Sequence, residues 1–266
     1  MLNTFPVNYR LLIAYEGTNY CGWQYQPNKP TIVGTLKDVF AEVFKKDVYI
    51  LGASRTDAGV HALGQVALVT ASLNLDPEIL RRAWNGRLPS SISIRALEYA
   101  PKEFYPFAHV YEKTYYYHFF TKRPLPFIAR YGALGPYRFD YGRLQEALSV
   151  FIGTHDFRSF CASGEIENTV RTITHISLEH IKRYDIYRIT VKGPGFLRYM
   201  IRRIVGASLE YASDPDCLIS ELTDALQACN PQQKFLTAPP QGLMLRKIQY
   251  KSSLDKSTSE NLLFNT

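Results

Sequence analysis

The feature that most constrains this chain is a polar, glycine-containing loop between two apolar runs. Residues 52–66 read GASRTDAGVHALGQV, after the apolar run VYIL at 48–51 and leading into the run VALV at 66–69. Short apolar runs bounded by polar residues and glycine are typical of buried strands. We therefore expect strands to fix both ends of the loop and to hold its polar side chains in place.

Two charged residues of this loop suggest chemistry. Arg55 and Asp57 are separated by one residue, and a nearby guanidinium favours the ionised form of a carboxylate that is partly withdrawn from water. This makes Asp57 a candidate nucleophile rather than a proton donor. The structural alternative is a surface ion pair on a turn. His61, in the same loop, is interpreted as a hydrogen-bonded structural residue.

The loop resembles the active-site loop of the TruA-type tRNA pseudouridine synthases, through RTDAGVHA at 55–62 and GQV at 64–66. Further sequence motifs of that family occur along residues 9 to 250, in the same order as in the family. They are YEGT at 15–18, GWQ at 22–24, Asn85 with LP at 88–89, KTYYY at 113–117, GTHDF at 153–157, MIRRIVG at 200–206 and GLML at 242–245. These motifs identify the chain as resembling a member of the TruA-type family.

Composition limits the class of protein. A chain of 266 residues with 46% hydrophobic side chains can bury a core without disulfides or metal. Cys21, Cys161, Cys217 and Cys229 form no Cys-x-x-Cys pair, so we expect free, buried thiols and no metal site. No apolar run has the length of a membrane span, and the first residues do not resemble a signal peptide. A cytoplasmic protein without membrane contact is expected.

The charge balance favours a polyanionic partner. The formal net charge is +7, with an isoelectric point near 9.1, as is common for proteins that bind nucleic acid. Nineteen tyrosines provide surfaces on which bases can stack.

The apolar periodicity predicts both strands and helices, and we expect an α+β fold of two related halves, because a similar order of elements occurs in each half. Each half should contain a mainly antiparallel sheet with flanking helices, over residues 1–105 and 106–251, followed by a disordered tail at 252–266. Strands are expected near 9–15, 48–51, 66–69, 91–99, 110–120, 173–181 and 184–192, and helices near 32–46, 77–84, 141–151, 196–211 and from Asp214-Pro215 onward. The resemblance implies the pseudouridine synthase fold, with a central basic cleft between the halves.

The resemblance also implies an activity, the isomerisation of uridine to pseudouridine in the anticodon stem-loop of tRNA, at positions 38, 39 or 40. Such an enzyme must free the base from its stack, and Asp57 corresponds to the family's catalytic aspartate. Residue types leave open whether Asp57 attacks C1′, adds to the ring or removes a sugar proton. No cofactor is implied, because the reaction is redox-neutral. Family members form homodimers.

Three further residues acquire catalytic roles through the resemblance. Arg55 would take the place of the extruded nucleotide in the RNA stack, a role that suits a planar cation, although it could instead orient Asp57 as an ion-pair partner. Tyr115 would pack against the target base, and Arg202 would pair with the catalytic aspartate. Tyr117 is interpreted as packing.

Other residues are expected to bind the substrate. Leu243 and Leu245 would line the base pocket, and Arg198 and Arg203 would bind phosphates on a solvated basic face.

The chain departs from the usual family pattern at Val33, Phe107 and Tyr199, which commonly are glutamine, arginine and histidine. All three residues lie outside the Asp57 loop. Their departures therefore bear on the expected RNA contacts more than on the chemistry. Two rival functions remain: a non-catalytic RNA-binding protein on the same scaffold, and a carboxylate-dependent hydrolase. A hydrolase usually needs two acids that flank one bond, and this loop offers one.

Overall fold

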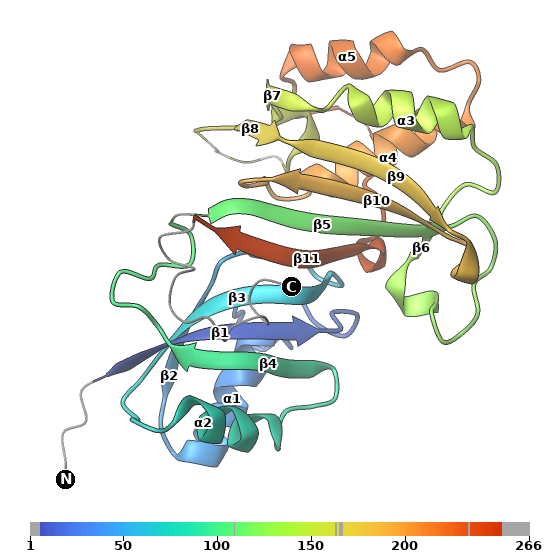
Figure 1. The fold of residues 1–266 in the computed structure, drawn as a ribbon. Helices are drawn as coiled ribbons and strands as arrows, with labels where there is room; N and C mark the ends of the chain where they lie inside the picture. The colour runs from blue at the N-terminus through green and yellow to red at the C-terminus, as the bar shows by residue number, and fades with distance from the viewer. Residues whose placement is uncertain (1–5, 109, 163, 165–166, 234, 252–266) are drawn as a thin grey trace. The chain divides into compact units, whose positions relative to one another are not determined.

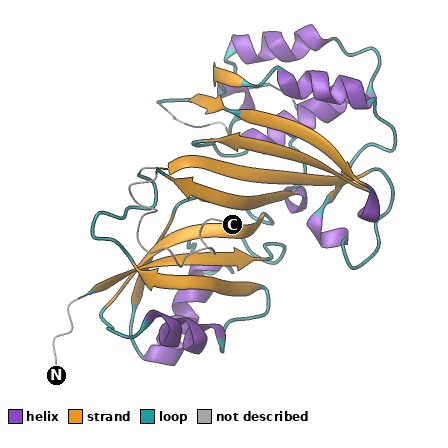
Figure 2. Cartoon of the chain, in the orientation of Figure 1, coloured by secondary structure: helices purple, strands orange, loops and turns teal. Residues whose placement is uncertain are grey.

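The computed structural model describes residues 6–108, 110–162, 164, 167–233 and 235–251. The chain divides into two compact units, Met1–Tyr111 with Leu245–Thr266, and Glu112–Met244. Both contain antiparallel strands and helices, as the predicted α+β class requires (Figures 1 and 2). The predicted disordered tail at 252–266 lies outside the described residues.

The strands of the first unit follow the order β4-β1-β3-β11, and β2 also pairs with β3. Their bounds are β1 Val7–Tyr15, β2 Val48–Gly52, β3 His61–Ala71, β4 Ile92–Tyr99 and β11 Leu243–Tyr250, of which Leu243 and Met244 belong to the second unit. β1 pairs antiparallel with both β3 and β4. Its residues from Tyr9 to Ile13 are all buried, which confirms the central strand predicted from its continuous apolar run.

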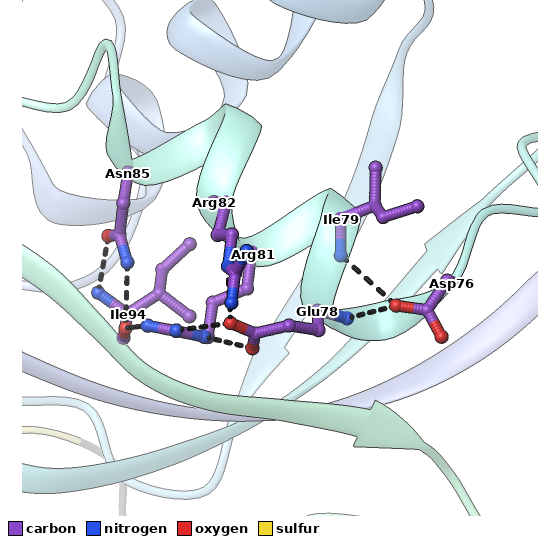
Figure 3. Close-up of polar contacts among 7 residues, drawn as sticks. All are labelled: Asp76, Glu78, Ile79, Arg81, Arg82, Asn85 and Ile94. Carbon is purple, nitrogen blue, oxygen red and sulfur yellow. Dashed lines mark hydrogen bonds and ion pairs between the residues drawn. The ribbon is translucent and has the colours of Figure 1, made fainter.

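Both predicted helices of this unit are present, and side chains cap their first turns. α1 (Ile32–Phe44) is capped by Thr31, whose Oγ1 accepts the Gly34 N–H at 3.1 Å. α2 (Pro77–Asn85) is capped by Asp76, whose carboxylate accepts the N–H groups of Glu78 and Ile79 (Figure 3). α1 packs on β2 and α2 packs on β4. The sequence signals that predicted these helix starts are local to each helix.

Asn85 ties the end of α2 to β4. Its side-chain amide donates to the Ile94 carbonyl and its carbonyl oxygen accepts the Ile94 N–H, each at 2.8 Å (Figure 3). The pairing of β1 with β4 shifts register beside Ile94, and such an irregularity leaves backbone groups without ladder partners. The family residue Asn85 is therefore a structural residue in this fold.

The second unit has the strand order β5-β10-β9, with antiparallel pairs. Its strands are β5 Val110–Phe120, β6 Ala133–Leu134, β7 Gly153–Asp156, β8 Val170–Ile173, β9 His175–Ile181 and β10 Ile186–Gly193, and its helices are α3 Tyr141–Ser149, α4 Met200–Ser213 and α5 Ile219–Ala228. β6 runs parallel to β5, and β7 pairs with β8 in a small separate sheet. α3 packs on α4 and β9 (Figure 1).

Two predicted helix starts were wrong. α4 begins at Met200 instead of residue 196, because Tyr199 adopts a left-handed conformation at φ +65° and the Arg198 carbonyl accepts the N–H of the distant Ala162. α5 begins at Ile219 instead of Asp214, because the Asp214 N–H still caps α4. The strand predicted at 173–181 is also divided, since β8 ends at Ile173 and β9 starts at His175.

The four cysteines are free thiols, as predicted, but only Cys161 is buried and the other three are partly exposed. Within the described part of the chain, no helix is long and apolar enough to cross a membrane.

Candidate active site

The Asp57 loop is shorter than its sequence suggested. The predicted loop extended to residue 66, but β3 already begins at His61 and leaves only residues 53–60 between the strands. Ala62 pairs with Tyr15, and Gln65 pairs with Ile13 of β1. The polar residues at 61–65 are therefore strand residues, whose partners lie far away in the sequence.

Backbone hydrogen bonds to residues 20–23 fix the loop. The Trp23 N–H donates to the Thr56 carbonyl at 3.1 Å, and the Gly59 N–H donates to the Tyr20 carbonyl at 3.2 Å. Inside the loop, the Val60 N–H donates to the Asp57 carbonyl at 3.2 Å. The backbone on each side of Asp57 is thus bonded to a second segment of the chain.

Two glycines allow this close approach. Gly22 has φ +93°, and a Cβ placed on it would lie 2.7 Å from the Thr56 carbonyl oxygen. A Cβ on Gly17 would lie 2.0 Å from the Val60 carbonyl oxygen. Glycine is therefore required at both positions, which gives the family motifs around residues 17 and 22 a structural reason.

A network of buried polar side chains supports the loop through hydrogen bonds. The Gln65 side chain is fully buried; its Oε1 accepts the Ser54 N–H at 3.1 Å, and its Nε2 donates to the Ser54 carbonyl at 2.6 Å. The hydroxyls of Tyr15 and Thr56 share a hydrogen bond of 2.8 Å. Sequence reasoning missed these supporting residues. Gln65 could have been found as a polar residue directly before the apolar run at 66–69, whereas Thr56, between Arg55 and Asp57, gave no such signal.

Asp57 and Arg55 differ in their exposure. Asp57 is partly buried and Arg55 is exposed. Among the described residues, none forms a hydrogen bond or an ion pair with the Arg55 guanidinium. His61 is buried, and its Nδ1 accepts the Gly17 N–H at 3.0 Å, which matches the structural role expected for it.

In the second unit, Tyr115 and Tyr117 point to the same face of β5. Tyr115 is buried and meets the Phe196 ring edge-on at 5.3 Å between centroids. The Tyr117 hydroxyl donates to the Pro239 carbonyl at 3.0 Å, and burial raises the pKa of Tyr117. Lys113 lies on this same face, and burial lowers the pKa of its ammonium group to about 8. Tyr117 is a packing residue, as predicted.

Arg202 is held by the backbone of residue 238. Its Nε donates to the Ala238 carbonyl at 2.7 Å, while the Ala238 N–H donates to the Arg202 carbonyl at 3.0 Å. Its guanidinium also lies over the Tyr199 ring, 5.2 Å from the centroid, and that of Arg198 lies 4.8 Å from the same centroid. Tyr199, one of the departures from the family pattern, is thus a shared aromatic support for two arginines.

The remaining predicted substrate residues have different surroundings. Arg198 is exposed, and its Nη2 donates to the Tyr199 hydroxyl at 3.0 Å. Arg203 is only partly exposed, and its guanidinium donates to the Cys161 carbonyl. Leu243 and Leu245 are buried at the start of β11.

The predicted site residues fall into two groups. Arg55, Asp57 and Leu245 belong to the first unit, and Tyr115, Arg198, Arg202, Arg203 and Leu243 belong to the second. Within the first unit, one rigid loop carries both Arg55 and Asp57. Within the second, the guanidinium groups of Arg198 and Arg202 both lie near the Tyr199 ring.

The comparison with protein families decides the class. A family described as tRNA pseudouridine synthase matches residues 11–107 and 147–251. The chain belongs to this family. Pseudouridine synthases are isomerases, so the family assignment makes the chain an RNA-modifying enzyme. The first matched stretch contains the whole Asp57 loop, and the second contains Arg198, Arg202 and Arg203.

Individual relatives agree with the family. The tRNA pseudouridine synthase A of Thermodesulfovibrio yellowstonii is 36% identical over 254 residues, which cover 92% of this chain and all of the relative. The tRNA pseudouridine synthase A of Pseudothermotoga lettingae is 35% identical over 246 residues, 90% of this chain and 98% of the relative. The tRNA pseudouridine synthase A 1 of Protochlamydia amoebophila is 36% identical over 250 residues, 92% of this chain and 96% of the relative.

Metal ligands are not clustered in the described parts of this family member. Residues 6–108, 110–162, 164, 167–233 and 235–251 contain no group of three His, Cys, Asp or Glu side chains that could hold a metal ion.

Proposed function

We propose that this chain converts uridine to pseudouridine in the anticodon stem-loop of tRNA, at positions 38, 39 or 40, with Asp57 as the catalytic carboxylate. The observation that carries the proposal is the fixed, partly buried position of Asp57. Its loop is bonded to residues 20–23 and supported by Gln65. A preorganised carboxylate is what a reaction at a single sugar–base bond requires.

The reaction breaks the bond between N1 and C1′, forms a bond between C5 and C1′, and exchanges the C5 proton for a proton on N1. The base must leave its stack before it can turn. The exposed Arg55 guanidinium is available to stack in the vacated position and to contact phosphate. We assign Asp57 to the step at the sugar or the ring, and Tyr115 to packing against the target base.

Arg202 is proposed to supply positive charge during the reaction. Its Nε bond to Ala238 and its position over Tyr199 restrict the guanidinium, and a restricted arginine loses less entropy when it binds an anion. Arg198 and Arg203 are proposed as phosphate contacts, Leu243 and Leu245 as pocket residues, and the active form as a homodimer on tRNA.

Tritium release from tRNA labelled at C5 of uridine tests this function. The wild-type chain should release tritium, and Asp57→Asn should reduce the rate at least about 10³-fold while tRNA binding persists. Asp47→Asn, a change of an exposed aspartate outside the loop, is the matched control and should remain active. Full activity of Asp57→Asn would refute the assignment. Binding without release by the wild type would indicate a non-catalytic RNA-binding protein, and free uracil would indicate a hydrolase.

The position of the modified uridine needs a separate measurement. Pseudouridine should disappear from positions 38, 39 or 40 in tRNA from cells that lack this chain, and it should return with the wild-type chain but not with Asp57→Asn. Loss at any other position would overturn the proposed site.

A further inference from the structure

The segment between β5 and α3 in the second unit is basic and rich in exposed aromatic side chains. Residues 121–139 contain four lysines and arginines but no aspartate or glutamate. They also contain two of the most exposed aromatic side chains of the described residues, Phe127 at 88% and Tyr137 at 71%. The segment lies between the two stretches that match the family, and outside both. The proposed reaction gives it no role.

The structure anchors this segment to the end of β5. β6 pairs in parallel with β5, with Phe120 opposite Leu134, and the Gly135 N–H donates to the Phe120 carbonyl at 2.8 Å. Gly132 packs against the Phe120 ring, where a Cβ would lie 2.5 Å from the nearest ring atom. Because paired parallel strands point the same way, the chain after Phe120 and the chain after Leu134 leave the sheet side by side.

The turn between β9 and β10 lies at the same end of the sheet (Figure 1). Tyr187, at the start of β10, pairs with Phe119 near the end of β5. Lys122 Nζ is 4.0 Å from Asp185 Oδ2 in that turn. The exposed Arg183 of this turn therefore lies at the same end of the sheet as the basic segment. In the same turn, Asp185 Oδ1 is hydrogen-bonded to His180 Nε2 at 2.9 Å.

We give the name strand-end surface to six exposed side chains of this segment and this turn: Arg123, Arg138, Arg183, Phe127, Tyr137 and Tyr184. Among the described residues, no carboxylate pairs with any of its three arginines. Two of these arginines lie near an aromatic ring of the same surface, Arg138 at 5.9 Å from the Tyr137 centroid and Arg183 at 5.4 Å from that of Tyr184. The surface offers positive charge and exposed aromatic side chains together.

We propose that the strand-end surface binds the RNA substrate away from the target nucleotide. Arginines neutralise phosphates, and exposed aromatic rings stack on unpaired bases. Phe120 lies five residues along β5 from Tyr115, a separation of about 17 Å in an extended strand. The surface therefore contacts a different part of the RNA from the base that packs on Tyr115. This proposal rests on the proposed function for the identity of the RNA.

A second copy of the chain fits this surface less well. In a two-fold symmetric dimer the same patch meets itself, so the three arginines would face three arginines. Like charges placed against each other oppose association. The charge favours a polyanion.

Binding of full-length tRNA tests the proposal. The double variant Arg123→Glu/Arg183→Glu should raise the Kd at least about tenfold, and it should reduce the slope of log K against log salt by about 1 to 2. Phe127→Ala and Tyr137→Ala should each raise the Kd about fivefold or more, because each removes a stacking surface. The single-turnover rate at saturating tRNA should stay within about twofold of the wild type.

The control is Lys46→Glu/Lys102→Glu, which changes the net charge equally at exposed lysines of the first unit and should change the Kd little. Thermal melting shows that each variant is folded. Wild-type Kd and salt slope in Arg123→Glu/Arg183→Glu would overturn the proposal. A change of oligomeric state in sedimentation, with unchanged tRNA binding, would also overturn it and would assign the surface to chain–chain contact. Because the Kd is measured without turnover, failure of the isomerase proposal would appear separately, as tRNA binding without tritium release.

Discussion

The side-chain amide of Gln65 is bonded to both backbone groups of Ser54, at 3.1 Å through its Oε1 and at 2.6 Å through its Nε2. The Ala53 N–H still donates to the Val66 carbonyl, so the ladder between the two strands continues to that point. Beyond it, the Gln65 side chain replaces the missing strand partner of Ser54. This keeps the start of the Asp57 loop fixed after β2 has ended.

Removing this amide should weaken both the fold and the reaction. Gln65→Met keeps the length of the side chain but removes the two hydrogen bonds that Gln65 makes to the buried backbone of Ser54, at a cost of roughly 1–3 kcal/mol each. We expect the free energy of unfolding, measured with urea, to fall by about 2–6 kcal/mol. We expect kcat to fall by about ten- to hundredfold, with little change in KM for tRNA, since the loop carries Asp57.

Gln145→Met is the matched control, because Gln145 is exposed on α3; stability and kcat should stay close to wild type. An unchanged kcat in Gln65→Met, with reduced stability, would show that the amide supports the fold alone.

Gly22 should not tolerate a side chain. In Gly22→Ala the new Cβ would lie 2.7 Å from the Thr56 carbonyl oxygen, at a backbone φ of +93° that L-residues rarely adopt. We expect the free energy of unfolding to fall by about 1–3 kcal/mol and kcat to fall with it, because the displaced backbone adjoins Asp57. In Gly86→Ala, the control, the residue has φ −62° and its new Cβ would have ordinary contacts from 3.4 Å. That variant should be as stable as the wild type or slightly more so. Equal stability of the two variants would contradict the close packing of residues 20–23 on the loop.

The stability of the chain should depend on pH through Lys113. Burial lowers the pKa of its ammonium group from 10.5 to about 8 in the folded state, so between these values the unfolded chain binds more protons than the folded one. The free energy of unfolding should therefore rise as the pH rises from 8 to 10.5, and Lys113 should contribute no pH dependence below that window.

Urea denaturation at several pH values, for the wild type and for Lys113→Met, isolates this contribution. The difference between the two free energies of unfolding should change across the window and stay constant below it. A constant difference from pH 7 to 10.5 would show that the Lys113 ammonium group is not destabilised by burial.

Sequence patterns predicted the elements whose signals are local. Asp76-Pro77 predicted the start of α2, and the continuous apolar run of β1 predicted a central strand, because a cap and a buried face depend on neighbouring residues. The Asp57 loop was found from its motif and its flanking apolar runs. The family was inferred from residues 55–66 and from further motifs along residues 9 to 250, and the comparisons confirmed it.

Two predictions failed because a distant contact decided the outcome. The start of α4 depends on Ala162, which bonds the Arg198 carbonyl, and nothing in residues 196–211 indicates that partner. The start of β3 depends on pairing with β1, which apolar periodicity near His61 does not show.

The sequence by itself determined the fold class, the Asp76 cap of α2 and the identity of the residues in the Asp57 loop, because these depend on patterns among neighbouring residues. Only the tertiary structure decided how that loop is held. Gln65, Gly22 and Tyr15 act on Ser54 and Thr56 through hydrogen bonds and close contacts that form after the strands have paired. Contacts across such separations depend on the three-dimensional register of the strands, which a local pattern does not contain.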